Sequence, residues 1–223
     1  MATTIENIIS SWSIRAVIFD LDGTLVDNNP FHLQSWLQYL ENMGRQISQE
    51  EFNRHLNGRT NKDAIEYIYG RKMDDAEAMV YTLEKETIYR QLYRPFIKPV
   101  NGLLALLPIL EQQQLPMAIA TSGIQVNIDF MFEHIPIRQY FRTIVNSAHI
   151  KKGKPDPEIY LTTAVQLNIP PANCLVFEDA VVGINAAKAA GMKAIAVSTT
   201  QTREELAAAD LVIRDFSELL EEQ

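Results

Sequence analysis

The chain has 223 residues, which is enough for one large domain or two modest ones. Its hydrophobic share of 47% and charged share of 22% are typical of a globular protein with a sizeable core. The formal net charge of −8 argues against general binding to nucleic acid or to an anionic membrane, so we expect neither as a partner.

The single cysteine, Cys174, excludes a disulfide within the chain and fits a reducing compartment. Residues 1–13 contain neither a basic start nor a long apolar run, so we predict no signal peptide. The same residues predict no transmembrane span. We expect a cytoplasmic protein that acts as a monomer.

Six short apolar runs, rich in Val, Ile or Ala, have the pattern of strands that are buried on both faces. These runs cover residues 15–21, 116–121, 142–147, 173–179, 193–199 and 210–213. Helical patterns over residues 103–113, 157–167 and 180–191 separate the later runs. The alternation predicts an α/β fold with a doubly wound, parallel, Rossmann-like sheet.

Residues 31–94 have a different pattern, with helical spacing and no convincing strand. Residues 31–98 also carry equal numbers of acidic and basic side chains, so the acidic excess lies in the rest of the chain. We therefore predict two domains. An α/β core comprises residues 1–29 and 97–223, and a small all-helical cap comprises residues 30–96, inserted after the first strand. The two connections between them are candidate hinges.

Two carboxylates, Asp20 and Asp22, directly follow the first predicted strand in the stretch VIFDLDGTLVDN. Ligands of a doubly wound sheet bind beyond the carboxyl ends of its strands. The period of two along a strand places both carboxylates on the same side. Carboxylates this close repel each other unless a cation lies beside them or one is protonated. A hard cation such as Mg²⁺ would supply that charge.

Two structural explanations compete with this one. An aspartate at the end of a strand often forms a turn or caps the next helix. A calcium-binding loop is excluded, because Gly23 follows the Asp-x-Asp at once and a strand, not a helix, precedes it.

Three further stretches place polar residues at the ends of predicted strands or at a helix start. AIATSG supplies Thr121 and Ser122, KKGKPDPEIY supplies Lys154, and VFEDAVVGINAAKAAGM supplies Glu178 and Asp179. Each residue alone could be a helix cap or a solvated charge. Together with the first acids they would assemble carboxylates, a hydroxyl and a base at one edge of the sheet.

The motifs DLDGT, ATSG, KPDPEIY and EDAVVGINAAKAAGM, in this order, resemble those of the haloacid dehalogenase-like phosphotransferases. The resemblance extends from about Arg15 to the end of the chain. The helical insert resembles the small mobile cap of that family. The resemblance implies that Asp20 is the nucleophile, which forms an aspartyl-phosphate. It implies that Asp22 is the general acid and base.

The same resemblance implies the remaining roles in the core. Mg²⁺ would be the cofactor, bound by Asp20, the carbonyl of Asp22, Asp179, and Glu178 as a ligand or as a partner of the ligands. Lys154 would neutralise charge on the phosphoryl group and on Asp20. The catalytic set is thus Asp20, Asp22, Thr121 and Lys154, and the phosphate-binding set is Thr121, Ser122, Gly123 and Lys154.

The cap resembles that of β-phosphoglucomutase and its sugar-phosphatase relatives. The resemblance implies a small phosphorylated metabolite as substrate, with specificity carried by the cap. The implied substrate-binding residues are His32, Trp36, Gly58, Arg59, Asn61 and Lys62. Trp36 could also be a core residue, Asn61 a helix cap, and His32 a solvated surface residue.

Three departures favour a phosphatase over the mutase. Asn61 occupies the position of the mutase's phosphate-gripping arginine, so Arg59 or Lys62 would have to substitute for it. Ile124 and Gln125 replace its sugar-phosphate-binding Lys-Asn pair, and Asn28 replaces a hinge threonine. We therefore predict a phosphatase acting on a sugar phosphate, with the mutase as the alternative. Two other functions are less favoured. Haloacid dehalogenation would not use Asp22 as a general acid and base, and a non-catalytic role would not explain why every catalytic position is filled.

Overall fold

The computed structural model describes residues 4–56 and 59–220. The chain forms two compact units. One unit, the α/β unit, comprises the residues up to Asp27 and those from Lys98 onward. The other, the helical unit, comprises Asn28–Ile97, one or two residues wider at each end than the cap predicted from the sequence.

The α/β unit contains a six-stranded sheet in which every neighbouring pair of strands is parallel. The strand order β3-β2-β1-β4-β5-β6 is that of a doubly wound fold, so the predicted fold class is confirmed. Each strand overlaps one of the six apolar runs of the sequence, and the third strand begins one residue before its run. The strands are β1 (Ala16–Phe19), β2 (Met117–Ala120), β3 (Phe141–Val145), β4 (Cys174–Glu178), β5 (Lys193–Val197) and β6 (Leu211–Ile213).

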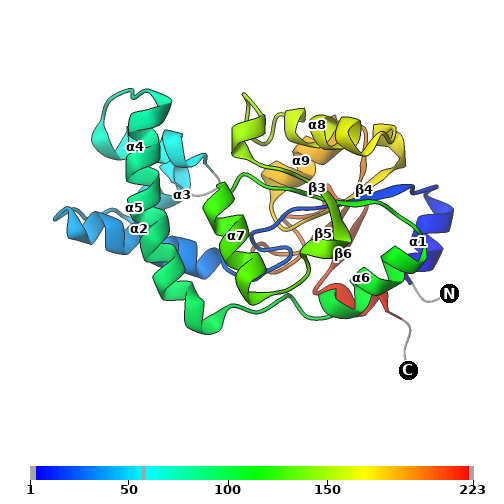
Figure 1. The fold of residues 1–223 in the computed structure, drawn as a ribbon. Helices are drawn as coiled ribbons and strands as arrows, with labels where there is room; N and C mark the ends of the chain where they lie inside the picture. The colour runs from blue at the N-terminus through cyan, green and yellow to red at the C-terminus, as the bar shows by residue number, and fades with distance from the viewer. Residues whose placement is uncertain (1–3, 57–58, 221–223) are drawn as a thin grey trace. The chain divides into compact units, whose positions relative to one another are not determined.

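Alternate residues of the central strands pack against opposite faces of this sheet. Ile18 and Val176 belong to the cluster that includes apolar residues of α8 (Glu158–Leu167) and α9 (Val181–Ala189). The next residues, Phe19 and Phe177, stack with their ring centroids 5.0 Å apart and contact Phe216. Figure 1 shows α8 and α9 on one side of the strands and α6 (Leu103–Gln112) on the other.

Two further helices of the α/β unit were not predicted from the sequence. They are α1 (Ile5–Ser11) and α7 (Gln125–His134). α7 begins without a side-chain cap, and its buried residues include adjacent Phe130 and Met131, so its sequence lacks both a start signal and a clean helical stripe. No helix in the described part of the chain is long and apolar enough to cross a membrane.

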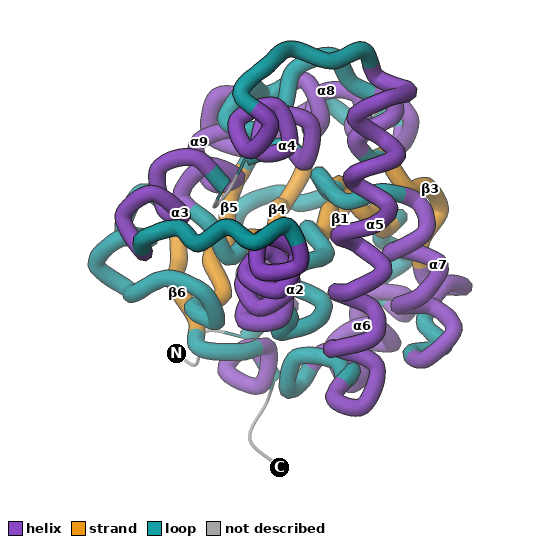
Figure 2. Tube along the Cα trace, turned by 90° about the vertical axis from the view of Figure 1, so that its left-hand side faces the viewer, coloured by secondary structure: helices purple, strands orange, loops and turns teal. Residues whose placement is uncertain are grey.

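The helical unit has four α-helices among its described residues, all labelled in Figure 2, and its buried apolar residues form a core of their own. Trp36, Tyr39, Ile65 and Ile68 are among the buried apolar residues. The helices are α2 (Asn29–Asn42), α3 (Gln49–His55), α4 (Asn61–Tyr69) and α5 (Asp75–Tyr93).

The strand order places the polar residues of the sequence motifs on neighbouring strands. β1 lies between β2 and β4, so the segments that follow these three strands are adjacent. The chain proceeds outward from β1 in one direction through β2 and β3, and in the other through β4, β5 and β6. Such a reversal of direction creates a crevice at the carboxyl ends of the strands.

Candidate active site

Asp20 follows the last residue of β1 and extends the strand pattern by one hydrogen bond, from its backbone N–H to the carbonyl of Phe177 at 2.9 Å. The side chain is almost fully buried. Three residues later, Gly23 adopts a left-handed conformation (φ +77°) and its N–H donates to the carbonyl of Val26 at 2.7 Å. This turn would strain any residue with a Cβ, and it leads the chain away directly after the acids.

The ammonium group of Lys154 lies between two carboxylates. Its Nζ donates to Oδ1 of Asp20 at 2.6 Å and to Oε1 of Glu178 at 2.5 Å. The lysine side chain is only 7% exposed, so both ion pairs lie in a medium that screens charge poorly. These residues are 134 and 24 positions from Lys154 in sequence, and only the fold brings them together.

Four donors converge on the carboxylate of Glu178. Oε2 accepts from the backbone N–H groups of Asp179 at 2.9 Å and Ala180 at 3.0 Å, and Oε1 accepts from Lys154 and from the Tyr160 hydroxyl at 2.9 Å. Gly183 makes room for this carboxylate, because a Cβ at that position would lie 1.7 Å from Oε1. The side chain is thus held in one orientation from all sides.

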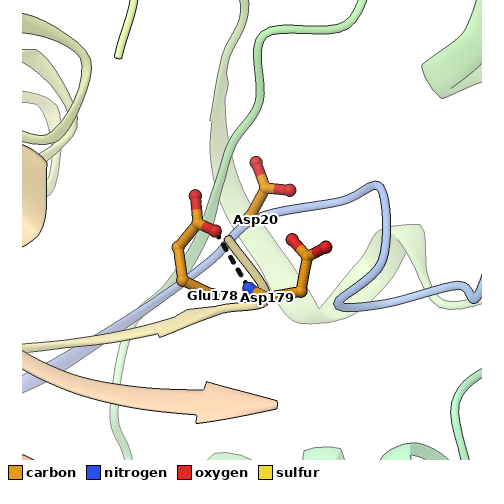
Figure 3. Close-up of side chains that lie close together, drawn as sticks. All are labelled: Asp20, Glu178 and Asp179. Atoms are coloured by element: carbon orange, nitrogen blue, oxygen red, sulfur yellow. Dashed lines mark hydrogen bonds between the residues drawn. The ribbon is translucent and has the colours of Figure 1, made fainter. Parts of the chain in front are cut away.

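Asp20, Glu178 and Asp179 each offer a carboxylate oxygen within 4.8 Å of the other two (Figure 3). All three residues are buried, and Lys154 supplies one positive charge against their three potential negative charges. Closely spaced hard oxygen donors with an excess of negative charge suit Mg²⁺ or a similar divalent cation. The residues present therefore fit the metal that the family resemblance implies.

The excess of buried carboxylates also affects the pKa values of the aspartates. Burial raises the pKa of Asp20 to about 8, and the nearby Glu178 and Asp22 add to the rise, whereas Lys154 opposes it. Burial, Glu178 and Asp20 hold the pKa of Asp179 well above its ordinary value. Burial alone would lower the pKa of Lys154, but the Asp20 and Glu178 carboxylates outweigh it and raise that pKa. A bound cation would favour the ionised aspartates.

The segment after β2 provides the candidate phosphate-binding groups. Thr121 is 1% exposed, and its Oγ1 accepts a hydrogen bond from the backbone N–H of Gly123 at 2.9 Å. Ser122 is exposed. A Cβ at Gly123 would lie 3.4 Å from Oδ2 of Asp22, which places this segment beside the second aspartate. The Thr121 hydroxyl can donate its proton to a ligand while it accepts from Gly123.

The structure thus brings the predicted core residues to the ends of β1, β2 and β4. Tyr160 and Gly183 are two contributors that sequence reasoning did not assign. Gly183 carries a signal, because an isolated glycine inside a helical pattern often marks a close approach of another group. Tyr160 carries no comparable signal, since a buried tyrosine is common in any core.

In the helical unit, three of the predicted substrate-binding residues gather around two charged residues that were not predicted. Nζ of Lys85 lies 3.0 Å from Nδ1 of His32 and 4.8 Å from the centroid of the Trp36 ring. Nδ2 of Asn61 donates to Oε1 of Glu86 at 3.1 Å. The helical spacing of α5 could have identified these two residues. It places Lys85 and Glu86 on the same buried face as apolar and aromatic residues.

The other predicted residues of this unit lie apart from that group or outside the described residues. Lys62 is ion-paired with Asp75 at 2.5 Å, and Arg59 is exposed and donates to the carbonyl of Arg54 at 3.4 Å. Gly58 lies outside the described residues. Asn28, at the start of the unit, is buried, and its Nδ2 donates to the Tyr89 hydroxyl at 2.6 Å.

The chain is similar to known proteins over most of its length. The family model for haloacid dehalogenase-like hydrolases matches residues 17–197. The fructose-1-phosphate phosphatase of Escherichia coli K12 is 31% identical over 81% of this chain and 95% of its own length. The β-phosphoglucomutase of Bacillus subtilis 168 is 32% identical over 92% of each chain.

A solved structure extends the similarity to the fold. It is a haloacid dehalogenase hydrolase, family IA, variant 3, from Entamoeba histolytica. It is 34% identical, aligns with a TM-score of 0.84, and covers 93% of this chain and 96% of its own.

Proposed function

Since this chain belongs to the haloacid dehalogenase-like hydrolase family, we propose that it is a Mg²⁺-dependent phosphatase acting on a small sugar phosphate. The observation that carries this proposal is the position of the Lys154 ammonium between Asp20 and Glu178. A carboxylate can approach a phosphate dianion only where positive charge cancels their repulsion, and Lys154 places that charge against Asp20.

In the first half-reaction, an oxygen of Asp20 attacks phosphorus and the bond from phosphorus to the sugar oxygen breaks. Asp22 gives its proton to the departing sugar oxygen. The Thr121 hydroxyl and the Lys154 ammonium bind the phosphoryl oxygens. Bound Mg²⁺, held by Asp20, Asp179 and the carbonyl of Asp22, would supply further neutralisation of phosphoryl charge.

In the second half-reaction, Asp22 takes a proton from a water molecule as that water attacks phosphorus. The bond between phosphorus and the Asp20 oxygen breaks, and inorganic phosphate leaves. Asp22 thereby regains the proton that it gave to the sugar, and the enzyme returns to its starting state. Glu178 holds Lys154 in place through both halves.

We propose that the helical unit is the cap, and that it contributes specificity through His32, Trp36 and Asn61. Relatives named as sugar-phosphate enzymes support a sugar phosphate as the substrate class. Mutase activity is the second candidate, because a β-phosphoglucomutase is 32% identical. Two observations weigh against mutase activity. Ile124 is buried, and the side chain of Gln125 makes hydrogen bonds to Asp129 and Asn146 instead of facing a substrate.

Phosphate release from a panel of sugar monophosphates tests the proposal, with and without Mg²⁺. Asp20→Asn should lower the rate at least about a thousandfold, because no other group can form the covalent intermediate. Asp27→Asn is the matched control, since Asp27 is exposed and lies seven positions away. Full activity of Asp20→Asn, or no hydrolysis by the wild type across the panel, would overturn the phosphatase assignment.

A second assay separates phosphatase from mutase. β-Glucose 1-phosphate is supplied with a trace of glucose 1,6-bisphosphate, and both products are followed. A phosphatase releases inorganic phosphate, whereas a mutase accumulates glucose 6-phosphate. Faster accumulation of glucose 6-phosphate than of free phosphate would make the chain a mutase.

A further inference from the structure

The loop that follows β5 is hydrogen-bonded to the turn that carries one of the candidate catalytic residues. β5 ends at Val197, and the hydroxyl of Thr199 donates to the carbonyl of Gly23 at 2.5 Å. This bond joins residues that are 176 positions apart in sequence. Gly23 directly follows Asp22, so a residue outside the sequence motifs holds the turn that contains the proposed general acid and base.

Gly23 is restrained at both of its backbone polar groups. Its N–H donates to the carbonyl of Val26 within the turn, and its carbonyl accepts from Thr199. The two peptide groups that flank Gly23 are therefore fixed in orientation. The first of these peptide groups is shared with Asp22, so the restraint limits the rotations that would move the Asp22 carboxyl away from the departing oxygen.

Thr199 lies in a loop that is anchored on both sides. The backbone N–H of Ser198 donates to the carbonyl of Ile213 on β6 at 2.8 Å. On the other side, Oε1 of Gln201 accepts from the backbone N–H of Val181 at 2.7 Å. α9 begins at Val181 without a cap from its own N-cap residue, so Gln201 serves as that cap from 20 positions away. These anchors hold the Thr199 hydroxyl in place as a donor.

A fixed donor matters here because the chain leaves the α/β unit soon after the turn. The helical unit begins at Asn28, and we predict this connection to be a hinge. A general acid must stay within hydrogen-bond reach of the atom that it protonates. The bond from Thr199 ties the turn to the sheet, so Asp22 keeps its position while the connection changes its backbone angles.

We propose, on the basis of the phosphatase function above, that Thr199 is a positioning residue for the general acid and base Asp22. It acts through the Gly23 carbonyl rather than by contact with the reacting atoms. Asp20 is held separately, by the carbonyl of Phe177 and the ammonium of Lys154. Loss of the Thr199 hydroxyl should therefore weaken proton donation to the sugar oxygen more than the attack of Asp20 on phosphorus.

The test compares two leaving groups. A sugar oxygen must receive a proton as it departs, whereas 4-nitrophenolate is a stable anion that leaves without one. The substrates are 4-nitrophenyl phosphate and the sugar monophosphate of the panel that the wild type hydrolyses fastest. The measured quantity is kcat/KM, which reports the steps up to loss of the alcohol and so isolates the half-reaction in which Asp22 gives its proton.

Four proteins are compared: wild type, Thr199→Val, Thr199→Ser and Thr162→Val. Thr199→Val removes the hydroxyl and keeps the shape of the side chain, and Thr199→Ser keeps the hydroxyl. Thr162 is half-buried like Thr199 and lies on α8, so its variant makes the same substitution outside this loop. Thr199→Ala replaces Thr199→Val, with the same expectations, in case melting curves show that the valine variant does not fold.

We expect Thr199→Val to lower kcat/KM about tenfold for the sugar phosphate and less than about twofold for 4-nitrophenyl phosphate. Thr199→Ser should return the value for the sugar phosphate to within about twofold of wild type, and Thr162→Val should change neither value. Equal losses for both substrates, no loss for the sugar phosphate, or no recovery in Thr199→Ser would overturn the inference.

Hydrogen exchange followed by mass spectrometry tests the tie independently of activity. Residues 20–26 should exchange at least about fivefold faster in Thr199→Val than in wild type or Thr162→Val, because the turn has lost a hydrogen bond. Unchanged exchange would overturn the inference. Faster exchange, together with a wild type that hydrolyses nothing on the panel, would refute the phosphatase function and leave the tie between Thr199 and the Asp22 turn standing.

Discussion

Two lysines with buried side chains, one in each unit, lie in surroundings of different charge balance. Lys154 contacts two carboxylates, those of Asp20 and Glu178, and a third, that of Asp179, lies within reach of the same cation site. Lys85 is ion-paired with the carboxylate of its sequence neighbour Glu86 at 3.0 Å. The first cluster has an excess of negative charge, and the second is balanced.

The difference in charge balance determines what each cluster can bind. An excess of buried carboxylates must be relieved by protonation or by a cation, and the raised pKa of Asp20 is the sign of that imbalance. A balanced pair needs no such relief and presents hydrogen-bonding groups instead. The comparison therefore separates a carboxylate-rich cluster in the α/β unit from a charge-balanced ion pair in the helical unit.

The largest effect should come from Lys154→Met. The substitution keeps most of the length of the side chain but removes the only cation placed between Asp20 and Glu178 by the described residues. We expect phosphate release to fall about a hundredfold to a thousandfold, because the charge that approaches the phosphoryl group is no longer cancelled.

Lys151→Met is the control for this variant, since Lys151 is exposed and only three positions away. Steady-state kinetics at saturating Mg²⁺ would measure both. Comparable losses in the two variants would show that the position of Lys154 between the carboxylates does not matter, and the contrast between the lysines would lose its basis.

A smaller effect should appear in the pH dependence of stability without Mg²⁺. The pKa of Asp20 is raised from 3.8 to about 8, chiefly by burial, so the fold favours the protonated carboxyl. The stabilisation that this group contributes is fully present below about pH 4 and is lost as the pH rises through 8. Asp20→Asn should therefore gain stability relative to wild type over that range.

Chemical denaturation in a chelator at several pH values would measure this difference, with Asp27→Asn as the control for loss of a carboxylate. Adding Mg²⁺ at pH 8 should stabilise the wild type more than Asp20→Asn, because the variant has lost a ligand. A stability difference that does not change with pH would contradict the proposed excess of negative charge around Asp20.

The smallest effect should come from Tyr160→Phe. This change removes only the hydroxyl that donates to Glu178 at 2.9 Å, and Lys154 still contacts that carboxylate. We expect kcat to fall about threefold to tenfold with little change in KM, because Lys154 would be held less firmly against Asp20. Tyr140→Phe makes the same change outside the site. Equal kinetics in wild type and Tyr160→Phe would show that the other three hydrogen bonds suffice to hold Glu178.

Much of the α/β unit could be predicted from the sequence because its signals are local. Buried parallel strands are short apolar runs, and all six were visible as such. Asp20, Glu178 and Asp179 stand near the ends of two of those runs, so their placement at the ends of strands followed from the strand assignment alone. α7 escaped prediction because it begins without a side-chain cap.

Only the tertiary structure decided which charges face one another. The sequence by itself determined that carboxylates, a hydroxyl and a lysine stand at the ends of strands. That Lys154 bridges Asp20 and Glu178 depends on a sheet order that brings residues 134 positions apart into contact. The ion pair between Lys85 and Glu86 could not be predicted from the sequence either, although the two residues are adjacent. Neighbours in a helix do not ordinarily face each other, and burial beside His32, Trp36 and Asn61 is what joins them.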